Sequence, residues 1–348
     1  MSLQFDLHRL SSLYQFKKDT IQLCIQFIKD VIKNSSHSKM KYTKKLNEIE
    51  TDLYDIFCRW NFNCIQKNTF DMNTFLPTDD FIILVDISYY LRRFHIELSD
   101  SLIEFPFHEF NKIREKAKEN SISLHTRPIS CSSLQNKRLH SIYKGNDFEN
   151  DKLKLLSRYY YLGGLNNSLS TPPEVLSLFK SHELFGTPFN TCSEYFCSPF
   201  QDEVLFGSSG SFFQFSEYQK DIVYFANPPF DDTFCTKMAE RLLEQLSVQL
   251  FSLIVIIPVW DKDQQDKYNL KNFGLSFESY QKLIQSPYFI KEEFLPKSCY
   301  PFFNYFYQRY VYISNTHIIN LGVPVDIKKI MSTWISLNNE KPKESKPI

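Results

Sequence analysis

The 348-residue sequence has few small residues, no excess of either charge and no cysteine framework. Only eight glycines and three alanines occur, against 33 phenylalanines and 20 tyrosines. Because aromatic residues are abundant throughout the chain, an aromatic cluster is weak grounds for a ligand-stacking site. The formal net charge is zero, which excludes a global basic field, so any nucleic-acid contact has to come from local patches.

The eight cysteines form no metal-binding or disulfide pattern. Neither Cys58 and Cys64 nor Cys192 and Cys197 have Cys-x-x-Cys spacing, and no histidine follows at zinc-finger spacing. The N-terminus lacks a basic segment followed by an apolar one, and the longest apolar run, residues 250–260, is too short to span a bilayer. We therefore expect a soluble, intracellular protein of the nucleus or cytoplasm, or of a viral factory or virion if the chain is viral.

The texture of the chain changes near residue 165. Before this point apolar residues recur at helical spacing, as at Ile21, Cys24, Ile25 and Ile28. After it, short apolar runs alternate with helical ones, which favours an α/β sheet. The sequence predicts a helical domain over residues 1–165, an α/β domain over residues 166–337 and a disordered polar tail over residues 338–348.

Within the α/β domain, the apolar runs predict an order of elements. Helices are expected over residues 172–180 and 234–249. Strands are expected over residues 204–206, 222–226, 251–257, 307–314 and 316–322. Because only Asn315 separates the last two strands, they could form a hairpin that closes one edge of the sheet.

The most informative segment is Asn227-Pro228-Pro229-Phe230, which directly follows the strand expected over residues 222–226. In open α/β sheets, ligands bind at the carboxyl ends of strands. The Asn227 side-chain carbonyl and the Pro228 backbone carbonyl can accept the two N–H bonds of an adenine amine, and Phe230 can stack on the base. The segment indicates methyl transfer to an exocyclic amine, whereas the alternative is an ordinary Asn-Pro turn.

Three further segments are candidates for cofactor binding. Thr171 is expected to cap a helix that starts at Pro172. Residues 183–190 contain a single glycine and are a poor copy of a glycine-rich loop. Residues 206–213 lie between two expected strands and could pass the adenosine of a cofactor. The candidate cofactor residues are Thr171, Pro172, Glu183, Gly186, Thr187, Pro188, Asn190, Ser211 and Phe212.

In their order along the chain, these segments resemble the γ-type amino-methyltransferases. They are more similar still to the family of the phosphorylated-CTD-interacting factor, the cap-specific adenosine 6-amino methyltransferases. The matching segments are Pro172-Pro173-Glu174-Val175, Phe185-Gly186-Thr187-Pro188-Phe189-Asn190, Phe206-Gly207-Ser208, Asn227-Pro228-Pro229-Phe230 and Ile254-Val255-Ile256-Ile257-Pro258 before Trp260. The resemblance covers residues 153–320 and includes a helical region ahead of the catalytic domain.

The resemblance implies an RNA adenosine N6-methyltransferase with S-adenosylmethionine as cofactor and no metal. Its fold would be a Rossmann-like S-adenosylmethionine-dependent methyltransferase core of the α/β class, preceded by a mostly helical domain. Its substrate would be the first transcribed adenosine, with or without a 2′-O-methyl group, next to a 7-methylguanosine cap. Capped RNA would be the partner, together with other transcription or capping proteins, and no membrane is implied. Asn227, Pro228, Pro229 and Phe230 would be catalytic, with Phe230 also binding the substrate base.

Contacts to the cap and to the RNA backbone are less sharply indicated. A methylated guanine is cationic and calls for aromatic faces, for which Trp260, Tyr300 and Tyr305 are candidates. Arg158 could contact the triphosphate or the RNA backbone, or could be structural in its apolar helix. The sequence shows no WW-type module, so a link to phosphorylated polymerase tails does not follow from the resemblance.

Two alternatives stay open. A DNA adenine N6-methyltransferase would flip the base out of its stack, although the neutral charge disfavours a binder of duplex DNA. A catalytically silent cap- or RNA-binding subunit could retain the same fold. The intact Asn-Pro-Pro-Phe segment (residues 227–230) argues against a silent subunit, whereas the single glycine of residues 183–190 argues for it.

Overall fold

The computed structural model describes residues 3–34, 53, 70–71, 76–77, 87, 104–119, 131–162, 169–230, 232–258, 277–305, 308–313 and 315–339. The chain divides into two compact units, Met1–Ser130 with Glu149–Leu165, and Cys131–Phe148 with Asn166–Ile348. Residues 131–148 thus join the unit that contains the sheet. Within the described part of the chain, no helix has both the length and the apolarity needed to cross a membrane.

The first unit is built on two helices, α1 (Leu3–Asn34) and α5 (Phe107–Glu119). Their aromatic side chains meet, with the Phe16 ring 5.8 Å from that of Phe110. The apolar face predicted for residues 21–28 is confirmed, since all four of its residues are buried. The remaining elements are β1 (Phe70–Asp71), which pairs antiparallel with β2 (Leu76–Pro77), and α7 (Phe148–Leu162).

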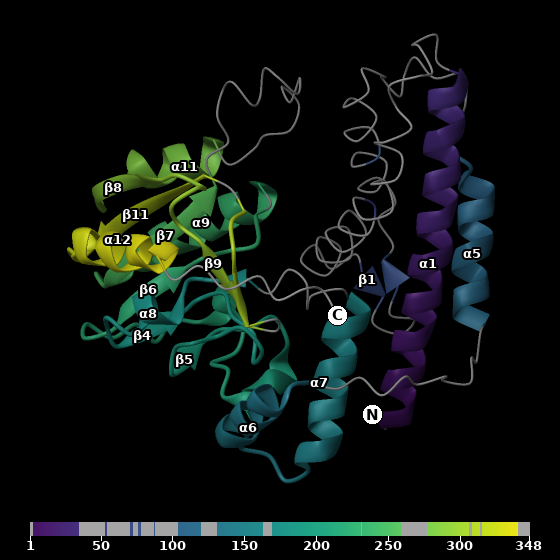
Figure 1. Ribbon diagram of the computed structural model, residues 1–348, viewed down its shortest axis with the longest axis horizontal. Helices are drawn as coiled ribbons and strands as arrows, with labels where there is room; N and C mark the ends of the chain where they lie inside the picture. The colour runs from purple at the N-terminus through teal and green to yellow at the C-terminus, as the bar shows by residue number, and fades with distance from the viewer. Residues whose placement is uncertain are drawn as a thin grey trace. The chain divides into compact units, whose positions relative to one another are not determined.

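The second unit contains a six-stranded sheet with helices on both faces (Figure 1). Across the sheet the strands are β5 (Tyr195–Phe196), β4 (Ser181–Glu183), β6 (Val223–Ala226), β7 (Ser252–Pro258), β11 (Thr316–Gly322) and β8 (Phe289–Leu295). The first four are mutually parallel. β11 runs antiparallel to both of its neighbours, so β8 again follows the direction of the first four. The predicted α/β class is confirmed.

Two smaller groups of elements complete this unit. A three-stranded antiparallel sheet has the order β10 (Arg309–Val311), β9 (Phe302–Asn304) and β3 (Leu169–Ser170). The α-helices are α6 (Ser133–Ile142), α8 (Pro173–Leu176), α9 (Asp232–Val248), α11 (Phe277–Ile284) and α12 (Ile327–Ser336). The 3₁₀ helices are η2 (Gln201–Phe206), η3 (Phe212–Gln214) and η4 (Leu337–Asn339).

Alternation along the strands divides the core of the second unit into two layers. On β6, Tyr224 and Ala226 pack with α9 and α11, whereas Phe225 packs with α8 and α12. The same alternation holds along β7, where Val255 belongs to the first layer and Ile254 to the second. Because both faces are covered, these strands are continuous apolar runs, which is why the sequence predicted them.

The strand predicted over residues 204–206 is wrong, because these residues end the 3₁₀ helix η2. The turn buries Phe206 but leaves Val204 exposed, so the short apolar run never forms one face of a sheet. Gly207 then takes a left-handed conformation, with φ of 87°, and terminates the helix.

The predicted hairpin of residues 307–314 and 316–322 is also wrong. β10 pairs with β9 in the small sheet, whereas β11 lies between β7 and β8. Ile318, Ile319 and Leu321 of β11 are fully buried, and a strand that is apolar on both faces belongs in the middle of a sheet. The predicted tail from residue 338 lies outside the described residues, except for Asn338 and Asn339 in η4.

Replacement of Gly322 tests the packing at the end of β11. Gly322 has φ of +76°, and a Cβ there would meet the Phe251 carbonyl oxygen and lie 2.8 Å from Leu246 Cδ2. We expect Gly322→Ala to lower the free energy of unfolding in urea by about 2–4 kcal/mol, from backbone strain and overpacking together. The matched control is Gly210→Ala, where φ is +86° and nothing lies within 4 Å. The control should lose only about 1 kcal/mol, and equal losses for the two variants would contradict the packing argument.

Candidate functional site

The carboxyl ends of β4 and β6 meet at the point where the strand order reverses. From β4 the chain passes to β5 on one side and then returns to β6 on the other side. The pairing continues past the end of β4, since the Leu184 N–H donates to the Phe225 carbonyl oxygen at 2.8 Å. Ligands of open α/β sheets bind outside the carboxyl ends at such a reversal, so the segments after β4 and β6 are the candidate site.

The Glu183 carboxylate, at the end of β4, is buried and fully engaged by the protein. Its Oε1 accepts a hydrogen bond from Ser170 Oγ at 2.6 Å. Its Oε2 accepts from Thr191 Oγ1 at 2.7 Å, from the Cys192 amide at 2.7 Å and from the Ser193 amide at 3.1 Å. Glu183, predicted to lie against the methyl donor, thus ties β3 and the returning loop to the end of β4.

The loop after β4 is a tight turn held by its own side chains. Asn190 Oδ1 accepts from the Thr187 amide at 2.7 Å and from Thr187 Oγ1 at 3.0 Å. The Phe189 amide donates to Thr187 Oγ1 at 3.2 Å. A Cβ on Gly186 would lie 3.2 Å from Phe196 Cβ, so this glycine is needed for close packing against β5. Thr187 and Asn190 therefore shape the loop, and Gly186 seats it on the sheet.

The predicted N-cap at Thr171 and the predicted helix over residues 172–180 are both wrong. α8 contains only Pro173–Leu176, and its N-cap is Pro172, with φ of −54° and ψ of 144°. Because Pro172 itself precedes a proline, it is excluded from the helical region. Thr171 therefore lies outside the helix, where it is buried and its Oγ1 has no hydrogen-bond partner among the described residues.

The Cys192 thiol lies among several of these groups. Its Sγ is 4.0 Å from the Thr171 carbonyl oxygen. Burial raises the pKa of the thiol well above its ordinary value, and the negative charge of Glu183 raises it further. A hydrogen bond from Tyr305 and the charge of Arg138 lower the pKa, and the charge of Glu174 raises it. The thiol is therefore neutral and has charged groups of both signs nearby.

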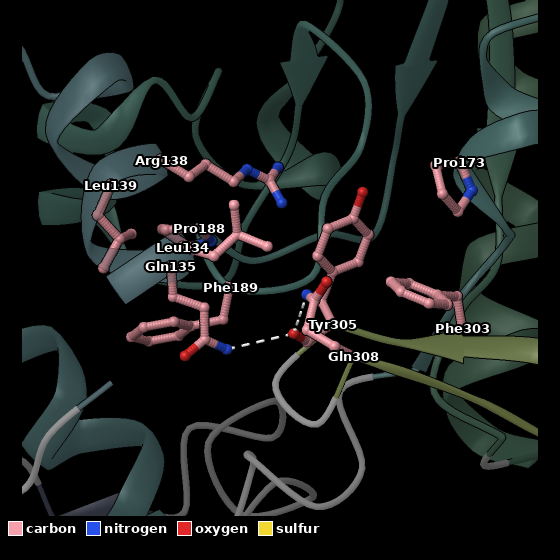
Figure 2. Close-up of a pocket in the computed structure, with 10 residues that line it drawn as sticks. All are labelled: Leu134, Gln135, Arg138, Leu139, Pro173, Pro188, Phe189, Phe303, Tyr305 and Gln308. Carbon is pink, nitrogen blue, oxygen red and sulfur yellow. Dashed lines mark hydrogen bonds between the residues drawn. The ribbon is translucent and has the colours of Figure 1, made fainter. Parts of the chain in front are cut away.

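A cavity of about 310 Å³ lies beside the loop after β4 (Figure 2). Its walls come from α6, the start of α8, that loop and the β9–β10 hairpin. The lining residues are Leu134, Gln135, Arg138, Leu139, Pro173, Pro188, Phe189, Phe303, Tyr305 and Gln308. Of the predicted cofactor residues, Pro188 lines this cavity, and of the predicted cap-pocket aromatics, Tyr305 does.

The sequence analysis missed the α6 wall, which carries Gln135 and Arg138. Ser132 Oγ accepts from the Gln135 amide at 3.2 Å, and Gln135 Oε1 accepts from the Ser132 amide at 3.0 Å. This capping box has the Ser-x-x-Gln signature that could have revealed the helix. Gln135 Nε2 also donates to the Tyr305 carbonyl oxygen at 3.2 Å, and the Arg138 guanidinium lies 4.8 Å from the centre of the Tyr305 ring.

The Asn-Pro-Pro-Phe segment leaves β6 directly and is partly open. The Asn227 side chain is half-buried and makes no hydrogen bond to any residue that the structure describes. Pro228 is buried, whereas Pro229 is exposed and its carbonyl oxygen accepts from Cys235 Sγ at 3.7 Å. The Phe230 ring lies edge-on to Phe302 of β9, at 6.3 Å. None of these four residues lines the cavity, although Phe303, the next residue of β9, does.

Other predicted site residues lie elsewhere. Phe212 is a core residue, packed 4.6 Å from Phe185, and Ser211 starts η3 through its backbone carbonyl. Tyr300 is buried against Trp334 at 6.0 Å. Arg158 lies on α7 of the first unit, and Trp260 lies outside the described residues.

Comparison with known families bears on the whole of this site. Residues 134–298, a little under half of the chain, match the family model described as Phosphorylated CTD interacting factor 1 WW domain. The predicted family is confirmed. The phosphorylated CTD interacting factor match runs from α6 to β8, so it includes the loop after β4 and the end of β6. Although the description names a WW domain, these residues form most of the six-stranded sheet. No curated protein matches the chain.

Replacement of Glu183 tests its role in holding the loop. Glu183→Gln would place an amide N–H₂ against groups that are themselves donors, so we expect the free energy of unfolding to fall by about 2–3 kcal/mol. Glu194→Gln, at an exposed position on the same loop, is the control and should change stability by less than about 0.5 kcal/mol. Urea unfolding measures both variants. A Glu183→Gln protein as stable as the control would contradict the assigned role.

Proposed function

We propose that this protein is an S-adenosylmethionine-dependent adenosine N6-methyltransferase that acts on RNA. Its proposed substrate is the first transcribed adenosine, with or without a 2′-O-methyl group, next to a 7-methylguanosine cap. One observation carries the proposal: the Asn-Pro-Pro-Phe segment leaves β6 at the strand-order reversal, within the part of the chain that matches the phosphorylated CTD interacting factor family. Motif, fold position and family match therefore point to the same chemistry.

The sheet topology supports a Rossmann-like methyltransferase core. Its parallel strands reverse their order between β4 and β6, which places a ligand crevice at the carboxyl ends of those strands. The reversed strand β11 lies between β7 and β8, at the far side of the sheet from β5. The sheet edge that holds β11 therefore stays away from the crevice.

The chemistry at the end of β6 follows from the adenine amine. Its lone pair is delocalised into the ring, so two acceptors that take its N–H bonds would draw the nitrogen toward tetrahedral geometry. The half-buried Asn227 amide, without a partner in the described protein, is free to accept one of these bonds. The Pro228 carbonyl would accept the second, and Phe230 would fix the plane of the base.

The residues after β4 fit a methyl donor. When bound, S-adenosylmethionine supplies an electrophilic methyl group. Thr171 has a buried hydroxyl that no described protein group satisfies, as expected where a ligand completes the site. Glu183 is occupied by four protein hydrogen bonds, so it would support the donor site through the loop rather than by direct contact.

The substrate is tested with a panel of oligonucleotides. Purified protein and radiolabelled S-adenosylmethionine are incubated with capped RNA that starts with adenosine, the same RNA without a cap, and duplex DNA. We expect N6-methyladenosine only in the capped RNA, identified by nucleoside analysis. Transfer to duplex DNA alone would instead indicate a DNA methyltransferase, and donor binding without transfer to any of them would indicate a silent subunit.

Asn227→Ala should abolish methyl transfer while leaving donor affinity within about twofold, because the amide acts on the base and not on the donor. Transfer to capped RNA gives the rate, and calorimetric titration with S-adenosylhomocysteine gives the donor affinity. The control is Asn146→Ala, an exposed position remote from β6 in sequence, which should retain full activity. Wild-type rates for Asn227→Ala would remove Asn227 from the mechanism.

A further inference from the structure

Three buried polar atoms near the Cys192 thiol have no hydrogen-bond partner within the described part of the chain. They are Arg138 Nη1, Glu174 Oε2 and Thr171 Oγ1. An unsatisfied buried polar group costs about 1–3 kcal/mol, and more if it is charged. Native proteins hold few such groups, and three of them in one neighbourhood indicate a ligand that satisfies them.

The three atoms come from segments that meet around one thiol. The Thr171 carbonyl oxygen is 4.0 Å from Cys192 Sγ. The charges of Arg138 and Glu174 both act on the pKa of that thiol, in opposite directions. Arg138 and Pro173, the neighbour of Glu174, both line the cavity beside the loop after β4. The cavity therefore has a cation on one wall and a carboxylate behind another.

The Glu174 carboxylate is only half used by the protein. Its Oε1 accepts a hydrogen bond from the Tyr310 hydroxyl at 2.7 Å, which fixes the side chain. The same contact leaves Oε2 as the unpaired atom. A carboxylate fixed in this way is preorganised to accept from a ligand donor.

The Arg138 guanidinium is likewise positioned but unsatisfied. Figure 2 shows it extending from α6 toward the Tyr305 ring, with Pro173 and Phe303 on the other side of the cavity. Arg138 is the one charged residue among the ten that line the cavity, and the other lining residues are apolar or neutral. Burial raises the pKa of the Tyr305 phenol above its ordinary value, so this hydroxyl also stays neutral.

We infer that this cavity binds the amino-acid end of S-adenosylmethionine, with Arg138 pairing with the carboxylate and Glu174 with the ammonium group. The inference rests on the proposed function, because that function supplies the ligand. A guanidinium binds a carboxylate through two parallel N–H bonds, the geometry for which arginine is suited. The Thr171 hydroxyl supplies a further hydrogen bond to the same end of the ligand.

A zwitterion fits these groups better than the cap does. A 7-methylguanine is cationic, and Arg138 already covers a face of Tyr305. A triphosphate carries several negative charges and would meet the Glu174 carboxylate as well as Arg138, so repulsion would offset attraction. An amino-acid end carries one charge of each sign a few ångströms apart, which matches one arginine and one carboxylate.

Calorimetric titration of the full chain tests this assignment with three probes. S-Adenosylhomocysteine has the whole amino-acid end, its decarboxylated analogue keeps only the amine, and 5′-methylthioadenosine has neither group. Arg138→Gln should weaken S-adenosylhomocysteine binding by about 10- to 100-fold and leave the other two probes unchanged, since only the first carries a carboxylate. Glu174→Gln should weaken the first two probes to a similar extent and spare the third, while its remaining oxygen still accepts from Tyr310.

Two exposed positions serve as controls, Lys137→Gln on α6 and Glu194→Gln on the loop, and neither should alter any affinity. Unfolding temperatures confirm that each variant is folded. If the wild type binds neither S-adenosylhomocysteine nor 5′-methylthioadenosine, the proposed function fails and this inference fails with it. If the wild type binds both equally, or Arg138→Gln weakens both equally, the proposed function stands and this inference alone is wrong.

Discussion

The buried carboxylate of Glu183 is the constraint on which the candidate site depends. It accepts four hydrogen bonds at the end of β4, from a β3 side chain, a loop side chain and two loop amides. Ser170 is the neighbour of Thr171, and Thr191 is the neighbour of Cys192. One ionised side chain therefore sets the positions of the segments that carry the unpaired Thr171 hydroxyl and line the cavity. A buried carboxylate with several donors is stable only while all of them are in place, which makes this loop a rigid part of the unit.

The sheet provides the second half of the arrangement. β6 is packed on both faces, by α9 and α11 on one side and by α8 and α12 on the other, so the Asn-Pro-Pro-Phe segment starts from a fixed point. The two prolines restrict the backbone immediately after that point. Catalysis through aimed acceptors requires such preorganisation, because an acceptor that must reorganise during the reaction loses much of its effect. The fold and the proposed chemistry are consistent at this level.

What the sequence could predict depended on whether a segment buries a recognisable pattern. β6, β7, β11 and α9 were predictable, because their residues are apolar on both faces or at helical spacing. β4 was not, since Ser181-His182-Glu183 looks like a polar surface stretch although all three residues are buried. His182 illustrates this, because burial lowers its pKa to about 4 and it remains neutral in the core. The end of β6 was predictable from its motif. The roles of Glu183 and Glu174 were not, because a sequence does not show that one carboxylate is fully hydrogen-bonded and the other only half.

The central claim is that the ends of β4 and β6 together bind a methyl donor and the adenine that receives the methyl group. A crystal structure of the protein with S-adenosylhomocysteine and a capped adenosine dinucleotide tests this claim most directly. The account predicts the thioether sulfur and the adenine amine next to each other, with the amine hydrogen-bonded to Asn227 and the Pro228 carbonyl. Adenosine bound away from the end of β6, or a donor seated elsewhere than at the loop after β4, would contradict it.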